Sequence, residues 1–243
     1  MLITNVKADA FATKCYILAP RGGSECVVVD PGFGVAGRLA AALAARNLRP
    51  AAVLLTHGHL DHTHDLTAVA RAYGIPAYIH PADDFMIADP FSGLGEEFGP
   101  QFEELIAPDW KWDQPDEVRP LADGMELELG GVRLAVEHTP GHTPGSSMFN
   151  LLPDRSPHSY CLVGDVLYAG TIGRTDMPGG DRGQTLTSLK GLLAKPDDTV
   201  LLTAHENDTT VGVERTANPF MRQAAEWDPT TGEPAPRTPT GGA

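Results

Sequence analysis

The residues best suited to chemistry lie in one short stretch, residues 56–62, with the sequence THGHLDH. Side chains two positions apart in extended backbone project to the same side, so the imidazoles of His57 and His59 should point together. A tight turn can direct the neighbouring Asp61 and His62 toward a second point. Neutral imidazole and carboxylate oxygen suit divalent metals such as zinc. Burying these groups without a metal would leave polar atoms unpaired, so the stretch predicts a metal site rather than a decorated helix start.

Three further polar residues have the same placement, each directly after an apolar run that predicts a strand. One lies in the rigid loop TPGHTPG (139–145), one in VGD (163–165) and one in TAH (203–205). Each is a weak signal alone, but the repeated placement at strand ends predicts that all of these side chains converge on one site. The three residues are His142, Asp165 and His205.

The rest of the chain alternates apolar runs with turn signals, which predicts strands alternating with helices in two loosely similar halves. Residues 81–115 are crowded with proline, glycine and aromatic residues, which indicates packed loops with short helices. The proline-rich segment 228–243 predicts a mobile tail after a single domain over 1–227. The predicted strands are 15–18, 26–29, 51–56, 76–80, 125–129, 132–137, 147–152, 160–163 and 199–203, and the predicted helices are 35–46, 64–73 and 185–193.

Composition excludes several classes of protein. The 243 residues carry a formal net charge of −14, which repels phosphate backbones and argues against a nucleic-acid partner. No apolar run is long enough to cross a membrane, and the first residues do not resemble a secretory signal, so we expect a cytoplasmic protein. Cys15, Cys26 and Cys161 show no CxxC spacing, which favours buried, reduced thiols over a nucleophile.

The order HxHxDH, TPGHTPGS, GD and a late histidine resembles the metallo-β-lactamase superfamily, and within it the single-domain, glyoxalase II-like (hydroxyacylglutathione hydrolase-like) proteins. The resemblance extends from CYIL (15–18) through GRTD (173–176) to TTVGVER (209–215) and NPF (218–220). It implies an α/β fold, a four-layer αββα sandwich, with the site along one edge of the two sheets.

The same resemblance implies a set of metal ligands and a cofactor. It assigns two divalent metals, with zinc expected and iron or manganese as alternatives. Asp165 would bridge the two metals, and Asp30 would steady the HxHxDH loop. The first metal would be held by His57, His59 and His142, and the second by Asp61, His62 and His205.

Two cations that share a carboxylate can also share a hydroxide, which would attack an acyl carbonyl. A thiolate is a good leaving group, so the expected substrate is a small-molecule thioester, with Asp61 and Asp165 as catalytic residues. The segment Ala204-His205-Glu206 departs from the usual Gly-His-Gly of glyoxalase II-type members. It resembles the persulfide dioxygenases of the superfamily, in which His57, His142 and Asp165 would hold one iron.

Other interpretations remain beside these. Arg174 could pair with Asp176 or could anchor a substrate carboxylate. No room for a glutathione-binding helical domain follows Phe220, so glutathione specificity is not implied. A non-catalytic scaffold is disfavoured by the complete ligand set, a secreted β-lactamase by Asp165 where those enzymes have cysteine, and a nuclease by size and acidity. The oligomeric state is left open, and the scheme leaves out His64, Asp65, His80, His138 and His158.

Overall fold

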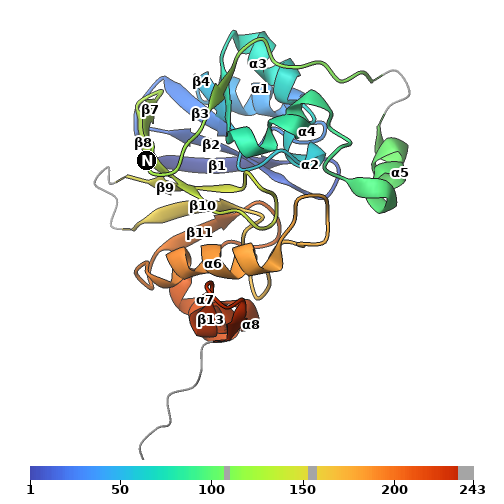
Figure 1. Ribbon diagram of the computed structural model, residues 1–243. Coiled ribbons are helices and arrows are strands. Elements are labelled where there is room, and N and C mark those ends of the chain that lie inside the picture. The colour runs from blue at the N-terminus through green and yellow to red at the C-terminus, as the bar shows by residue number, and fades with distance from the viewer. Residues whose placement is uncertain (107–109, 153–157, 235–243) are drawn as a thin grey trace, which may run out of the picture.

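The computed structural model describes residues 1–106, 110–152 and 158–234, and its core is two six-stranded sheets packed face to face (Figure 1). The first sheet is formed by the amino-terminal half of the chain. Its first three strands are antiparallel and its last three are added in parallel. In spatial order the strands are β1 (Leu2–Lys7), β2 (Lys14–Ala19), β3 (Glu25–Val29), β4 (Arg49–Leu54), β5 (Ala77–Ile79) and β6 (Val118–Pro120).

The second sheet is formed by the carboxy-terminal half. All its neighbouring strands are antiparallel except β10 and β11, which are parallel. In spatial order the strands are β12 (Thr209–Thr210), β11 (Val200–Thr203), β10 (Tyr160–Gly164), β9 (Ser147–Leu151), β8 (Val132–His138) and β7 (Glu126–Leu129). A separate small hairpin pairs β13 (Trp227–Asp228) with β14 (Glu233–Pro234).

Helices cover the outer face of each sheet (Figure 1). The helices of the first half are α1 (Ala36–Ala44), α2 (Leu60–Thr63), α3 (Leu66–Tyr73), the 3-10 helix η1 (Pro81–Asp83), α4 (Asp84–Ala88) and α5 (Gly95–Leu105). Those of the second half are α6 (Arg182–Leu193), α7 (Val211–Ala217) and α8 (Pro219–Glu226).

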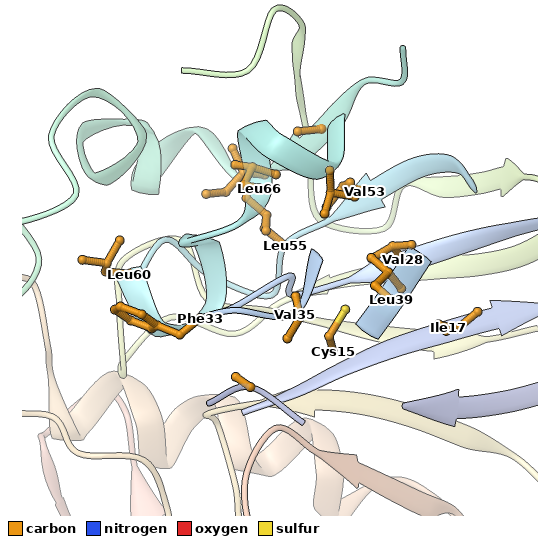
Figure 2. Close-up of a cluster of buried hydrophobic side chains, with 14 of the residues drawn as sticks. Cys15, Ile17, Val28, Phe33, Val35, Leu39, Val53, Leu55, Leu60 and Leu66 are labelled. Atoms are coloured by element: carbon orange, nitrogen blue, oxygen red, sulfur yellow. The ribbon is translucent and has the colours of Figure 1, made fainter. Parts of the chain in front are cut away.

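The central strands β2, β3, β9 and β10 are buried on both faces, which explains their continuous apolar runs. In β2, Ile17 faces the helices of the first half, whereas Leu18 faces the second sheet. Figure 2 shows the first of these clusters, with Ile17 and Val28 of the sheet near Leu39 of α1. A third cluster packs α6, α7 and α8 on the outer face of the second sheet. These layers confirm the predicted αββα sandwich.

The three cysteines are buried and form no disulfide, as predicted. Burial raises the pKa of the Cys26 and Cys161 thiols to about 12. Both thiols are therefore protonated at neutral pH, and a thiolate nucleophile is disfavoured.

Several elements differ from the sequence prediction, each for a local reason. Strand β1 was missed because it is half exposed and lacks a continuous apolar run. Helix α3 begins at Leu66 rather than residue 64 and ends as predicted at Gly74, whose φ of 64° suits glycine. Helix α6 begins three residues before the predicted start, because the Asp181 carboxylate caps it by accepting a hydrogen bond from the Gln184 amide (2.9 Å).

The end of the chain was predicted as a tail from residue 228. Residues 228–234 take part in the β13–β14 hairpin, and residues 235–243 lie outside the described part of the chain. The domain boundary at 227 therefore stays a prediction. Of the helices in the described ranges, none is long and apolar enough to span a membrane.

Candidate metal centre

The seven predicted ligand residues emerge from loops at one edge of the sandwich, and the structure brings all of them together. The loop after β4 carries His57 and His59, and helix α2 directly after it carries Asp61 and His62. The loops after β8, β10 and β11 carry one residue each. Their side chains form groups whose potential ligand atoms lie within 4.8 Å of one another. These groups are His57, His59 and His142; His57, His62 and Asp165; and Asp61, His62 and His205.

The first group consists of three buried imidazoles whose nitrogen atoms face each other. His142 Nε2 lies 3.2 Å from His57 Nε2 and 2.9 Å from His59 Nδ1. The Nδ1–H of His142 donates to the Arg174 carbonyl oxygen (2.7 Å), so the Nε2 atom of the neutral ring carries the lone pair. His57 Nδ1 lies 3.1 Å from Thr56 Oγ1, whose own proton goes to Asp30 Oδ2. Both Nε2 atoms are therefore acceptors, and a cation between them would satisfy both.

The second group adds carboxylates to imidazoles. Asp61 Oδ2 lies 3.5 Å from His62 Nε2 and 3.4 Å from His205 Nε2. The Nδ1–H of His62 donates to Asp30 Oδ2 (3.0 Å), and that of His205 donates to the Phe11 carbonyl oxygen (3.1 Å). Each Nε2 atom is thus directed at the centre, where it would offer a lone pair to a metal that displaces its proton.

Asp165 lies between the two groups. Its Oδ1 is 3.3 Å from His62 Nε2 and 3.6 Å from His205 Nε2, and its Oδ2 is 3.5 Å from His142 Nε2. One carboxylate oxygen therefore faces each group, which is the arrangement that a bridging ligand needs.

Unsatisfied polar atoms mark the same place. Among the described residues, four buried side-chain nitrogen or oxygen atoms lack a hydrogen-bond partner, and two of them, His62 Nε2 and Asp165 Oδ1, lie at the centre, 3.3 Å apart. Buried polar atoms without a partner are costly. The donor set and these atoms fit divalent metal ions.

The two groups differ in their preferred charge. Burial and the neighbouring histidines lower the pKa of His57, and burial lowers that of His59 to about 3. Although burial opposes it, Asp165 and Asp61 raise the pKa of His205 to about 10. His62 and His205 hold the pKa of the buried Asp61 carboxyl at about 2. The first group is therefore neutral imidazole, the form that binds metals, and the second surrounds ionised carboxylates with positive charge.

Sequence reasoning missed a buried carboxylate, Asp83, which joins the two loops of the first group. Its Oδ2 accepts hydrogen bonds from the Gly58 amide (3.0 Å) and the Thr143 hydroxyl (2.7 Å), and its Oδ1 accepts one from the Gly145 amide (2.6 Å). A side chain at Gly145 would collide with this carboxylate. No spacing signal marks Asp83, because its partners lie up to 62 residues away.

A second missed network holds the loop of His205. The Lys14 ammonium is buried and donates to Asp208 Oδ1 (2.6 Å), and the Tyr16 hydroxyl donates to the same atom (2.9 Å). The Thr203 hydroxyl donates to the His205 carbonyl oxygen. Glu206, at the position where the resemblance leads one to expect glycine, has a φ of 56°. The network thus fixes a turn with an unfavourable backbone conformation.

The remaining candidates lie at or outside the site. The Arg174 guanidinium makes a bidentate ion pair with Asp176 (2.7 and 2.8 Å). Of the two predicted roles, pairing with Asp176 is therefore the one that the structure shows. His64 stacks between Phe33 and Trp110. The other histidines contact no predicted ligand in the described interactions: His80 stacks on His138, and His158 lies near Tyr160.

A cleft of about 370 Å³ opens above the centre. Its floor includes His59, Asp61, His142 and Asp165, so a bound molecule would reach the ligand residues. Its walls are Phe11, Phe98, Gln101, Phe102, Tyr168, Arg174 and Met177. A larger hollow of about 480 Å³, lined by Trp110 and Trp112 among others, contains none of the ligand residues.

Comparison with known proteins agrees with this geometry. A model of the metallo-β-lactamase superfamily matches residues 8–205. An uncharacterized protein of Mycobacterium tuberculosis is 44% identical over 224 residues, which covers 91% of this chain and 98% of that protein. The hydroxyacylglutathione hydrolase GloC of Haemophilus influenzae is 30% identical and covers 91% and 98% of the two chains.

Solved structures give the same fold. The BLEG-1 B3 metallo-β-lactamase superimposes with a TM-score of 0.76 at 30% identity, over 90% of this chain and 99% of that one. TTHA1623 in a di-iron-bound form superimposes with a TM-score of 0.72 at 32% identity, over 89% and 99%.

Proposed function

Because the chain belongs to the metallo-β-lactamase superfamily, we propose that it is a metal-dependent hydrolase that cleaves thioesters at a two-metal centre. The observation that carries the proposal is the position of Asp165, with one carboxylate oxygen toward each histidine group. A site for one metal would need only one such group. The similarity to a hydroxyacylglutathione hydrolase supports the thioester as substrate class, and the di-iron form of TTHA1623 supports a two-metal centre.

In this proposal His57, His59 and His142 hold the first metal, Asp61, His62 and His205 hold the second, and Asp165 contacts both. When bound, the divalent metals would lower the pKa of a water molecule and polarise the substrate carbonyl. We assign zinc as the expected metal, with iron or manganese as alternatives, because imidazole and carboxylate suit all three.

The chain itself prepares the centre for this chemistry. The hydrogen bonds at the Nδ1 atoms of His57, His62, His142 and His205 hold each Nε2 lone pair toward the centre. Asp61 lines the cleft, and its depressed pKa keeps its carboxylate ionised, so it can orient a water by accepting a hydrogen bond from it. Asp30 connects both groups, since it accepts hydrogen bonds from Thr56 and His62.

A mononuclear iron dioxygenase acting on a persulfide is the second candidate. The three residues that such a site needs also lie together, since His142 Nε2 is 3.2 Å from His57 Nε2 and 3.5 Å from Asp165 Oδ2. The Ala204-His205-Glu206 segment favours it too. The convergence of Asp61, His62 and His205 favours the hydrolase, because a one-iron site leaves these residues without a metal.

The variant His205→Ala separates the two functions. For the hydrolase, second-metal content should fall while the first metal is retained, and thioester hydrolysis should drop by orders of magnitude. Metal content by plasma mass spectrometry, thioester hydrolysis and oxygen uptake on a persulfide are measured on the same preparation. His158→Ala, an exposed histidine away from the centre, is the matched control.

The dioxygenase predicts a different result. The wild-type protein would contain about one iron per chain and consume oxygen on the persulfide, and His205→Ala would change neither strongly. That outcome, or a wild-type protein that binds metal and hydrolyses no thioester, would overturn the proposed function.

A further inference from the structure

Aromatic side chains line the cleft together with the ligand residues. Phe102 of α5 stacks on Phe11 of the β1–β2 turn, with ring centroids 4.9 Å apart and an interplanar angle of 22°. Phe33 supports both rings from below, at 6.1 Å from Phe102 and 6.4 Å from Phe11. Phe98 and Met177 complete an apolar surface beside the metal centre. We call Phe11, Phe98, Phe102 and Met177 the aromatic wall.

The aromatic wall rests on the core of the first half. Phe33 belongs to the buried cluster drawn in Figure 2, where it lies near Leu60 of α2. Phe33 also stacks on His64 at 4.1 Å. Phe33 and the mutual stacking of Phe11 and Phe102 hold the rings, while half of the Phe11 side chain stays exposed to a ligand.

Away from the two metals that the centre would hold, the cleft offers little positive charge to an anionic ligand. Among the residues that line it, Arg174 is the sole cationic side chain apart from the histidines of the centre. Its guanidinium is paired with both carboxylate oxygens of Asp176 and lies 3.8 Å above the Phe98 ring. Arg174 is therefore already bound to Asp176 and packed on Phe98. The net charge of −14 adds long-range repulsion of anions.

Building on the thioesterase activity proposed above, we propose that the substrate is a thioester that places an uncharged, apolar group on the aromatic wall and has no carboxylate or phosphate near it. Recognition then comes from burial of apolar area against Phe11, Phe98 and Phe102. A tripeptide thiol such as glutathione, with two carboxylates, would find no unpaired cation on this wall.

Two non-hydrolysable thioethers with the same hexyl group test the proposal. S-hexyl-N-acetylcysteamine is neutral, and S-hexylglutathione carries the two carboxylates. Calorimetric titration of the metal-loaded protein should show at least about tenfold tighter binding of the neutral compound. Phe102→Ala should weaken that binding about tenfold, because a buried aromatic contact is lost. Phe85→Ala, an exposed phenylalanine outside the cleft, is the matched control and should bind as the wild type does.

A second variant tests the charge argument without removing any part of the wall. Asp176→Asn releases Arg174 from its ion pair, so affinity for S-hexylglutathione should rise while that for the neutral compound stays constant. The proposal therefore stays testable even if Phe102→Ala does not fold, because a gain in affinity in Asp176→Asn requires a folded site.

Equal or tighter binding of S-hexylglutathione to the wild-type protein would overturn the proposed substrate class, as would unchanged affinities in Phe102→Ala. Hydrolysis of the corresponding hexanoyl thioesters is assayed in parallel. Selective binding without hydrolysis of either thioester would contradict the proposed function alone, so the two failures are distinguishable.

Discussion

The two ligand groups of the centre are held in different ways. The first group is fixed by buried hydrogen bonds to side chains and carbonyl groups: Thr56 holds His57, the Arg174 carbonyl oxygen holds His142, and Asp83 joins their loops. In the second group the buried Asp30 carboxylate holds His62, whereas His205 depends on a turn. His205, whose side chain is 17% exposed, is held by the Phe11 carbonyl oxygen and by the loop that Lys14 and Asp208 fix.

Backbone strain is found near both groups but is greater around the second. Phe11, Ala12 and Glu206, which lie near the second group, have φ angles of 57°, 53° and 56°, and Asp30, which supports both groups, has a φ of 54°. A residue other than glycine in the left-handed region costs roughly 1–2 kcal/mol. The second group therefore depends on more strained backbone than the first, and contacts from distant segments maintain it. The difference implies that remote substitutions should affect the second metal more readily than the first.

The largest effect is expected from Asp165→Asn, which acts on both groups. The amide nitrogen would place hydrogen-bond donors where one group needs an anionic ligand, so hydrolysis should fall by orders of magnitude and metal content should fall below two per chain. Metal analysis, activity and circular dichroism are measured together. Asp198→Asn, an exposed aspartate, is the control. A folded Asp165→Asn protein with near-normal turnover would show that this carboxylate does not serve both groups.

The next effect concerns the first group alone. Asp83→Asn replaces a carboxylate oxygen by a donor that faces amide and hydroxyl donors, and affinity for the first metal should fall about 10–100-fold. Competition with a metal chelator measures it. The neighbouring exposed Asp84→Asn provides the comparison, with no expected change. Equal losses at both metals would contradict the separate support of the two groups.

For the second group the matching change is Lys14→Met. Loss of the buried ammonium frees the Asp208 loop, so affinity for the second metal should fall about tenfold with the first metal retained. Lys7→Met is the control. Lys7 lies opposite Lys14 in the β1–β2 register but is exposed, so no change in metal affinity is expected. If Lys14→Met releases the first metal instead, the assignment of this network to His205 is wrong.

The smallest effect is a gain in stability from Glu206→Gly. Glycine adopts the observed φ of 56° without steric cost, so the free energy of unfolding should rise by about 1 kcal/mol. The melting temperature of the metal-free protein should rise by about 2–4 °C. Glu128→Gly, in exposed strand β7, should lower stability, because glycine is unfavourable in strands. A destabilised Glu206→Gly would mean that the side chain offsets the strain of the turn.

The sequence by itself predicted the fold class, which is confirmed, and the seven candidate ligand residues that the structure brings together. Apolar runs buried on both faces marked most strands of the sandwich, and polar residues directly after these runs marked the loops. The i, i+2 spacing of His57 and His59 places both side chains on the same side of an extended backbone, so their proximity could be predicted without the structure. Strand β1 was missed because it is half exposed, and helices α7 and α8 were missed because they span only seven and eight residues.

Only the tertiary structure decided how the centre is supported and what surrounds it. Lys14 and Asp208 are 194 residues apart, and Gly145 and Asp83 are 62 apart. The aromatic wall likewise joins Phe11 to Phe102, and the choice of Asp176 as the partner of Arg174 depends on side-chain direction. Such contacts follow from how the two sheets and α5 pack, and no spacing along the chain encodes them.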